Sequence, residues 1–102
     1  MESRLRFTYQ EKEYKIKFYH SVFGETVRRK PTNVRYTDCR IYEIEGGLVA
    51  LGSARCSPLD NFSKEKGRKL SLKDALSESN SYISQTKDKE FRRLVWNAYF
   101  GR

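Results

Sequence analysis

Apolar and polar residues alternate in two short segments near the start of the chain, residues 4–10 and 14–18. In each segment every second side chain is aromatic or aliphatic. A period of two places these side chains on one face of a β-strand. The polar step at Glu11 and Lys12 predicts a turn between two antiparallel strands, the second of which can continue to Phe23.

The segment that follows, residues 24–33, is polar and strongly basic. It contains the run Arg28, Arg29, Lys30 and Pro31. Such a run beside a proline is typical of exposed chain between regular elements. We therefore predict an exposed basic loop here.

A second pair of strands is predicted over residues 34–56. The apolar residues from Val34 to Ile44 have strand-like spacing that slips once near Asp38, as a β-bulge would make it do. Gly46 and Gly47 can adopt the left-handed conformations of a tight hairpin turn. The first half of the chain is thus predicted to be an antiparallel sheet of about four strands, arranged as two hairpins.

After Cys56 the apolar spacing changes from two to three and four. Residues 57–60 match a capping box with proline at the first helical position, while Ser63 and Ser71 are further candidate caps. A first helix is expected from about Ser63 or Ser71 to the early eighties. Its predicted apolar stripe comprises Leu72, Ala75, Leu76, Ser79 and Ile83.

A last helix is indicated by one continuous apolar face near the end of the chain. Thr86 is the expected cap at its start, and Gly101 can end it. Its predicted core residues are Phe91, Leu94, Val95 and Ala98. Strands first and helices last, without βαβ alternation, predict an α+β fold with two C-terminal helices on one face of the sheet.

Length and composition fit one small domain over residues 1–102. The chain is 37% hydrophobic and 14% aromatic, which is enough for one core and argues against disorder. Its longest apolar run, residues 48–51, is far short of the roughly 20 residues that cross a bilayer. The N-terminus lacks the layout of a secretory signal, so we expect a cytoplasmic protein with no membrane partner.

The charge balance points to anionic partners. The chain carries 21 Lys and Arg against 13 Asp and Glu, a net charge of +8. This excess favours nucleic acids and nucleotides as partners and argues against a protein that imitates DNA. Many of these cations are also expected simply to keep the domain soluble.

Catalytic and metal-binding patterns are weak. His20 is the single histidine and has no recognisable nucleophile motif beside it. Cys39 and Cys56 are expected to be two reduced thiols, and with one histidine they fall short of a zinc set. No P-loop or dinucleotide fingerprint is present. We therefore expect no enzyme, no cofactor and no metal.

The densest basic cluster lies after residue 63. It comprises Lys64, Lys66, Arg68, Lys69 and Lys73, opposed in that window only by Glu65. At a helix N-terminus, free amides and the helix dipole would add to these cations and favour a phosphate. Arg68 is the first candidate for a forked grip on that phosphate, and Gly67 permits close approach of a ligand or of the sheet.

Two residues before this cluster suit a nucleotide. Phe62 can stack on a base, and Asn61 can bond a base edge or a ribose hydroxyl. The structural alternatives are a core anchor for Phe62 and a capping role for Asn61. Lys64 and its neighbours would then be solvated individually.

Two further basic groups are present. The first comprises Arg28, Arg29, Lys30, Arg35 and Arg40, and with Tyr36 and Tyr42 nearby it has the composition of a nucleic-acid surface. The second is Arg92 and Arg93 beside Trp96 and Tyr99. Trp96 lies one position off the apolar face of the last helix, so it either widens the core or seals a subunit interface.

The stretch from Ala54 to Lys64, followed by Gly67-Arg68-Lys69 and Ala75-Leu76, resembles small phage and prophage proteins. These proteins share a strand, a Cys-x-x-x-Asp-x-Phe pattern, Gly-Arg and a helix. Some are sponges of the Thoeris anti-defence type, which bind cyclic ADP-ribose signals. The resemblance implies a non-catalytic oligomer with pockets between subunits, Arg68 on the phosphates and Phe62 on the base.

The leading hypothesis from the sequence is a phage-encoded anti-defence protein of the host cytoplasm that sequesters a small anionic, cyclic nucleotide. One alternative is a host-takeover protein that binds nucleic acid with the same cations. Another is an inhibitor that binds a host nuclease or defence complex through protein contacts alone.

Overall fold

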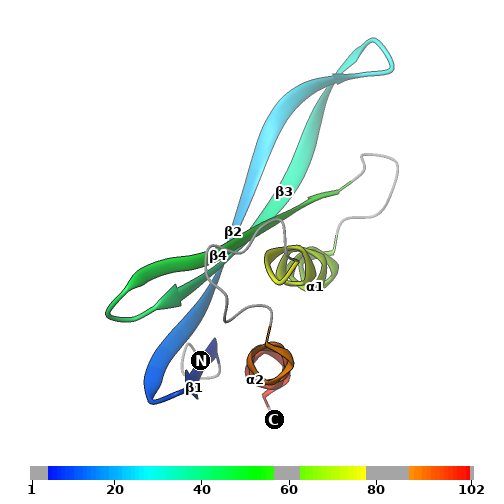
Figure 1. Cartoon of the computed structure of the whole chain (residues 1–102). Helices are drawn as coiled ribbons and strands as arrows, with labels where there is room; N and C mark the ends of the chain where they lie inside the picture. Colours follow the sequence, from blue (N-terminus) through cyan, green and yellow to red (C-terminus); the bar gives the residue numbers. More distant parts are fainter. Residues whose placement is uncertain (1–4, 57–62, 78–87, 102) are drawn as a thin grey trace.

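The computed structural model describes residues 5–56, 63–77 and 88–101 and confirms the α+β fold (Figure 1). Four strands are followed by two helices. In chain order these elements are β1 (Arg6–Tyr9), β2 (Lys12–Val27), β3 (Lys30–Glu43), β4 (Gly47–Cys56), α1 (Lys64–Ala75) and α2 (Lys89–Phe100).

The four strands form one antiparallel sheet in the order β1-β2-β3-β4. Each strand pairs with its neighbour in the chain, so the connections are hairpin turns. The first turn is made by Gln10 and Glu11, both with positive φ, one residue earlier than predicted. The third uses Gly47 at φ +94°, which confirms the predicted glycine turn.

The predicted loop over residues 24–33 is wrong. β2 and β3 stay paired as far as Val27 opposite Lys30, and only Arg28 and Arg29 form the turn between them. The basic residues are exposed as predicted, but they lie at the tip of a long hairpin. The segment is exposed and charged because it is the solvent-facing end of two paired strands.

The bulge predicted near Asp38 is also misplaced. The β2–β3 register runs through Asp38 without interruption, while the β3–β4 pairing shifts between Ile41 and Tyr42. This shift allows two consecutive residues of β4, Val49 and Ala50, to be buried. The apparent slip arises because Tyr36 points to the face opposite that of Cys39 and Ile41.

The helix boundaries match the prediction at two of four ends, the start of α1 and the end of α2, and differ at the other two. α1 begins at the Ser63 cap, whose hydroxyl accepts from the Lys66 amide, and ends at Leu76 instead of in the early eighties. Asp88, not Thr86, caps α2, and Gly101 ends it at φ +75° as predicted. Residues 57–62, Ser79, Ile83 and Thr86 lie outside the described residues. Neither described helix is long and apolar enough to cross a membrane.

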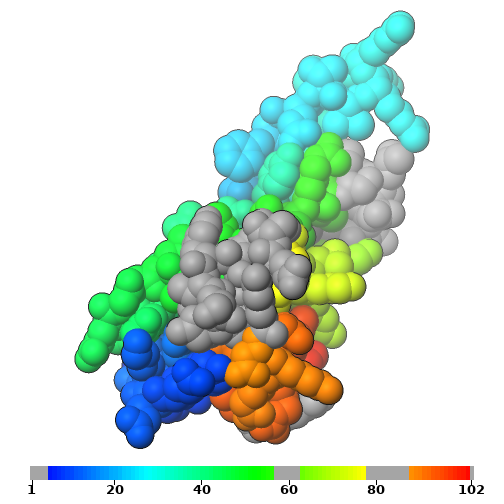
Figure 2. Space-filling view, viewed as in Figure 1, coloured from blue at the N-terminus to red at the C-terminus, as the bar shows by residue number. Residues whose placement is uncertain are grey.

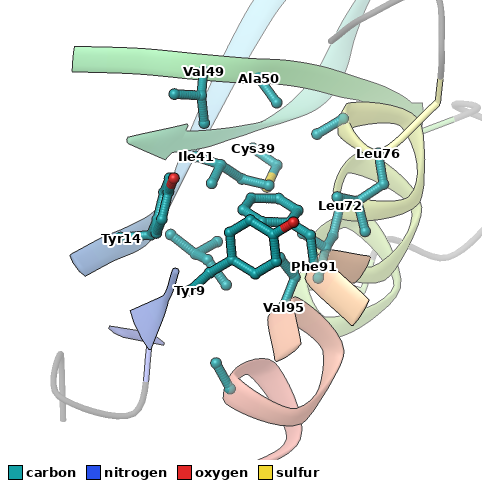
Figure 3. Packing of buried hydrophobic residues seen from close by; sticks show 13 residues of the cluster. Tyr9, Tyr14, Cys39, Ile41, Val49, Ala50, Leu72, Leu76, Phe91 and Val95 are labelled. Carbon is teal, nitrogen blue, oxygen red and sulfur yellow. The ribbon is translucent and has the colours of Figure 1, made fainter. Parts of the chain in front are cut away.

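The core lies between one face of the sheet and both helices (Figure 3). At its centre, the ring of Phe91 packs against three aromatic rings of β1 and β2. The buried residues are Tyr9, Tyr14, Ile16, Cys39, Ile41, Val49, Ala50, Leu72, Ala75, Leu76, Phe91, Val95 and Ala98. Trp96 packs at the margin of this cluster, so it widens the core.

Cys39 and Cys56 are both thiols, as the sequence predicted. Cys39 is buried in the core and Cys56 is half-buried at the end of β4. Burial raises the pKa of the Cys39 thiol, which therefore packs as a small apolar group.

Tyr9 ties β1 to the start of α2. Its hydroxyl donates a hydrogen bond to Asp88, the residue that also accepts from the Glu90 amide as the helix cap. This bond raises the pKa of Tyr9 from 10.0 to about 12 and lowers the pKa of Asp88. A phenolate at this position would repel the carboxylate.

This contact predicts an alkaline loss of stability. Because the folded chain keeps Tyr9 protonated to higher pH than the unfolded chain does, its contribution is complete below pH 10.0 and is lost as the pH rises to about 12. Urea unfolding at a series of pH values should show this fall, and Tyr9→Phe should make it shallower. An unchanged slope in Tyr9→Phe would contradict the assignment.

Candidate functional site

The sheet has one face covered by the helices and one that they leave open. Directly opposed residues of antiparallel strands share a face, so the core-facing pairs Ile16–Ile41 and Phe18–Cys39 alternate with pairs on the other side. We call this other side the open face. Its side chains include Arg6 of β1, Glu13, Lys15, Lys17, Tyr19, Ser21, Phe23 and Glu25 of β2, Val34, Tyr36, Asp38, Arg40 and Tyr42 of β3, and Leu51, Ser53 and Arg55 of β4. Of these, Val34 is buried.

Two cations oppose each other at the centre of the open face. Lys17 and Arg40 are cross-strand partners in the β2–β3 register. Like charges at directly opposed positions destabilise a sheet unless an anion or another partner compensates. The carboxylate of Asp38 on the same face compensates part of this charge, and one positive charge of the pair is left over to attract an anion.

Aromatic rings flank this pair on both sides. The Arg40 guanidinium lies 4.8 Å from the ring centre of Tyr19, and Lys15 Nζ lies 5.5 Å from that of Tyr42. A hydrogen bond from Arg40 to the Tyr42 hydroxyl lowers the pKa of Tyr42. We call Lys17, Tyr19, Arg40 and Tyr42 the quartet.

One donor of Arg40 stays unused, although its guanidinium contacts both Tyr19 and Tyr42. Its Nε is buried and has no hydrogen-bond partner among the described residues. A buried donor without an acceptor is unfavourable, so a phosphate or a base edge that reached Nε would supply the partner it lacks.

A hollow adjoins the quartet where β1 stops along the edge of β2. It has a volume of about 390 Å³, in the range of small-ligand sites. Its lining includes Leu5 and Phe18 as apolar surface, Tyr19 as a ring, and the side chains of Arg6, Lys15 and Lys17 as cations. A planar aromatic group with an attached anion would match this lining.

Further along the open face, Glu25 joins three strands. It accepts a hydrogen bond from the Tyr36 hydroxyl and forms an ion pair with Arg55, whose Nη2 lies 3.0 Å from Oε1. These bonds lower the pKa of Glu25. Phe23 packs edge-on against Tyr36 at 5.6 Å and remains 57% exposed.

Part of the α1 cluster predicted from the sequence lies against the sheet. Lys64 and Arg68 are close enough to His20 to lower its pKa, after loss of solvent around the ring as the largest cause. His20 Nδ1 lies 3.0 Å from the Thr37 hydroxyl. A Cβ on Gly67 would lie 2.4 Å from that same hydroxyl, so Gly67 serves the close approach of helix and sheet.

The other cations of α1 do not join this contact with His20. Lys69 Nζ lies 3.4 Å from Glu65 and 5.8 Å from the ring centre of Phe100. Lys66 and Lys73 are exposed. Asn61 and Phe62, the predicted base contacts, lie outside the described residues.

The second predicted basic group is divided by the hairpin. Arg28 lies at its tip, Arg35 lies on the helix-side face opposite Val22, and Arg40 belongs to the quartet. The sequence analysis missed Lys17 and Tyr19. Both residues are at the polar positions of the β2 alternation, which the sequence marked only as facing away from the core. Their grouping with Arg40 and Tyr42 depends on the strand register.

No protein-family model, curated protein or solved structure matches this chain. The resemblance to phage proteins stays a hypothesis. Its Asp-x-Phe part falls on residues 57–62, outside the described part of the chain. Function is therefore inferred from the geometry of the chain itself.

Proposed function

We propose that this protein binds single-stranded nucleic acid on the open face of its sheet. The observation that supports this most directly is the quartet, in which two opposed cations lie between two tyrosine rings. Phosphates would compensate Lys17 and Arg40, and bases would stack on Tyr19 and its neighbours. No catalytic step is part of this proposal.

A single strand suits this face better than a duplex does. Tyr19 is 42% exposed and Phe23 57%, and each presents a ring from a broad sheet surface. Bases are available for such stacking only when they are unpaired. Every base has a π-face, so we expect weak sequence preference.

The first test measures stacking. Fluorescence anisotropy with a labelled oligothymidylate should give a dissociation constant that Tyr19→Ala raises about 10-fold, since one stacked base contributes about 1–3 kcal/mol. Tyr19→Phe keeps the ring and should bind within about 2-fold of the unmodified chain. Equal binding by Tyr19→Ala and Tyr19→Phe would contradict the proposal.

The second test measures how the binding constant depends on salt concentration, with a matched control for the charge removed. Lys17→Gln/Arg40→Gln should reduce the slope of log K against log salt by about 1.4, or about 0.7 per phosphate contact. Lys89→Gln/Arg93→Gln removes two exposed cations from α2 and should leave the slope unchanged. Absence of oligonucleotide binding at low salt would refute the proposed function outright.

A small anionic nucleotide is the second candidate ligand, as the resemblance implies. Lys64 and Arg68 favour it, because both cations of α1 lie close to the His20 ring on β2. In that case the protein would act in the host cytoplasm as a phage-encoded sponge. The same preparations distinguish the two: a thermal shift with ADP-ribose derivatives that Arg68→Ala abolishes, without oligonucleotide binding, selects the nucleotide.

A further inference from the structure

The β2–β3 hairpin continues well past the rest of the sheet. β4 is paired with β3 as far as Cys56 opposite Arg35, so within the described part of the chain residues 23–34 form a two-stranded ribbon, which we call the arm. It extends away from both helices (Figure 1), and its outer end stands clear of the other described elements (Figure 2).

The turn at the tip of the arm has an unfavourable sequence for its conformation. Arg28 and Arg29 both have positive φ, +52° and +66°. A two-residue hairpin turn of this kind favours Asn-Gly, because side chains with a Cβ are strained in the left-handed region. Two arginines at these positions therefore sacrifice local stability, as Gln10 and Glu11 do in the first turn, and the tip differs from that turn in its positive charge.

The tip carries a concentrated, unneutralised charge. Arg28, Arg29 and Lys30 are all exposed, and no ion pair within the described ranges involves them. The open face by itself has a modest positive excess, five cations against three carboxylates. These are Arg6, Lys15, Lys17, Arg40 and Arg55 against Glu13, Glu25 and Asp38.

The open face continues onto the arm without a break in the register. Phe23 and Tyr36 follow Tyr19 on the same face, and Phe23 is exposed. From Tyr19 to Arg28 the strand rises about 30 Å, at about 3.3 Å per residue. A strand of nucleic acid held at the quartet would need several more nucleotides to reach the tip.

We propose that the arm is the outer half of the nucleic-acid site and that its tip cations hold the phosphate backbone of the strand whose bases stack at the quartet. This inference rests on the proposed function. It adds a length requirement, because short oligonucleotides can occupy the quartet without reaching the tip.

The test replaces the strained turn by a favourable one that lacks charge. R28N/R29G should fold with a Tm equal to or above that of the unmodified chain, because Asn-Gly suits the turn. With an oligothymidylate of about 20 nucleotides at low salt it should bind about 10-fold more weakly, and the salt slope should fall by about 1.4. With about 5 nucleotides its affinity should be unchanged.

The matched control is R28K/R29K, which keeps both charges and should bind the long oligonucleotide like the unmodified chain. Equal affinity of R28N/R29G and the unmodified chain for the long oligonucleotide would overturn the arm proposal while leaving the quartet in place. An equal loss for both lengths would overturn it as well, since the tip would then act without a length requirement. No binding of either length by the unmodified chain would instead refute the proposed function.

Discussion

Phe91→Ala is expected to lower the free energy of unfolding by about 3–5 kcal/mol. The Phe91 side chain is fully buried. Its ring centre lies 5.4 Å from that of Phe7, 5.1 Å from Tyr9 and 5.3 Å from Tyr14, each in an edge-to-face arrangement. Truncation would remove all three contacts and leave a cavity among rings that cannot collapse without moving β1 or α2.

The position of Phe91 makes the loss cooperative. β1 has four residues and lies at one edge of the sheet, and α2 packs chiefly against it. Without the ring, the short strand and the last helix lose their shared anchor. We therefore expect α2 and β1 to lose their packing on the rest of the core together.

Urea unfolding followed by the fluorescence of Trp96 on α2 measures this effect. Phe91→Leu keeps most of the apolar volume and should lose clearly less than the alanine variant. An alanine variant within about 1 kcal/mol of the unmodified chain would show that the aromatic cluster is not the main anchor of α2.

The sheet could be predicted from the sequence because each strand buries one face, which makes apolar and polar residues alternate along the chain. Where burial ends, that signal ends as well. Residues 24–33 form strands whose side chains face water on the arm, so their composition matched a loop. The hydrogen-bonded pairing of β2 and β3 therefore extends beyond the residues whose apolar alternation predicted these strands.

The candidate site was harder to predict for a related reason. The highest density of Lys and Arg in the sequence is at α1, where five cations lie in ten residues, so the site was predicted there. The helix then divides them, with Arg68 toward His20 and Lys69 toward Glu65. The quartet draws on two strands, and its members become neighbours only through the register of Lys17 with Arg40.

Gly52→Ala is expected to destabilise the fold by about 3 kcal/mol or more, because α1 and β4 touch backbone to backbone at this residue. A Cβ on Gly52 would lie 2.1 Å from the Ala75 nitrogen and 2.3 Å from the Ser71 carbonyl oxygen. Overpacking in a core typically costs about 1–3 kcal/mol, and here neither neighbour is a side chain that can rotate away. The helix would have to move off the sheet.

Such a movement would break a second contact. The Ser53 amide, on the outer edge of β4, donates to Asp74 Oδ2 of α1 at 2.9 Å. This bond helps to hold the helix across the edge strand and satisfies an amide that would otherwise be open to pairing with another chain. Gly52→Ala should therefore lower the denaturation midpoint and also increase aggregation on partial unfolding.

Gly24→Ala is the matched control, since a Cβ there meets nothing within 4 Å. It lies on the arm in β2 and should change stability by less than about 1 kcal/mol. Gly67→Ala should fall between the two, because its Cβ would meet the Thr37 side chain, which can rotate, while alanine favours the helix. A Gly52→Ala variant as stable as Gly24→Ala would mean that α1 does not dock on β4 through this residue.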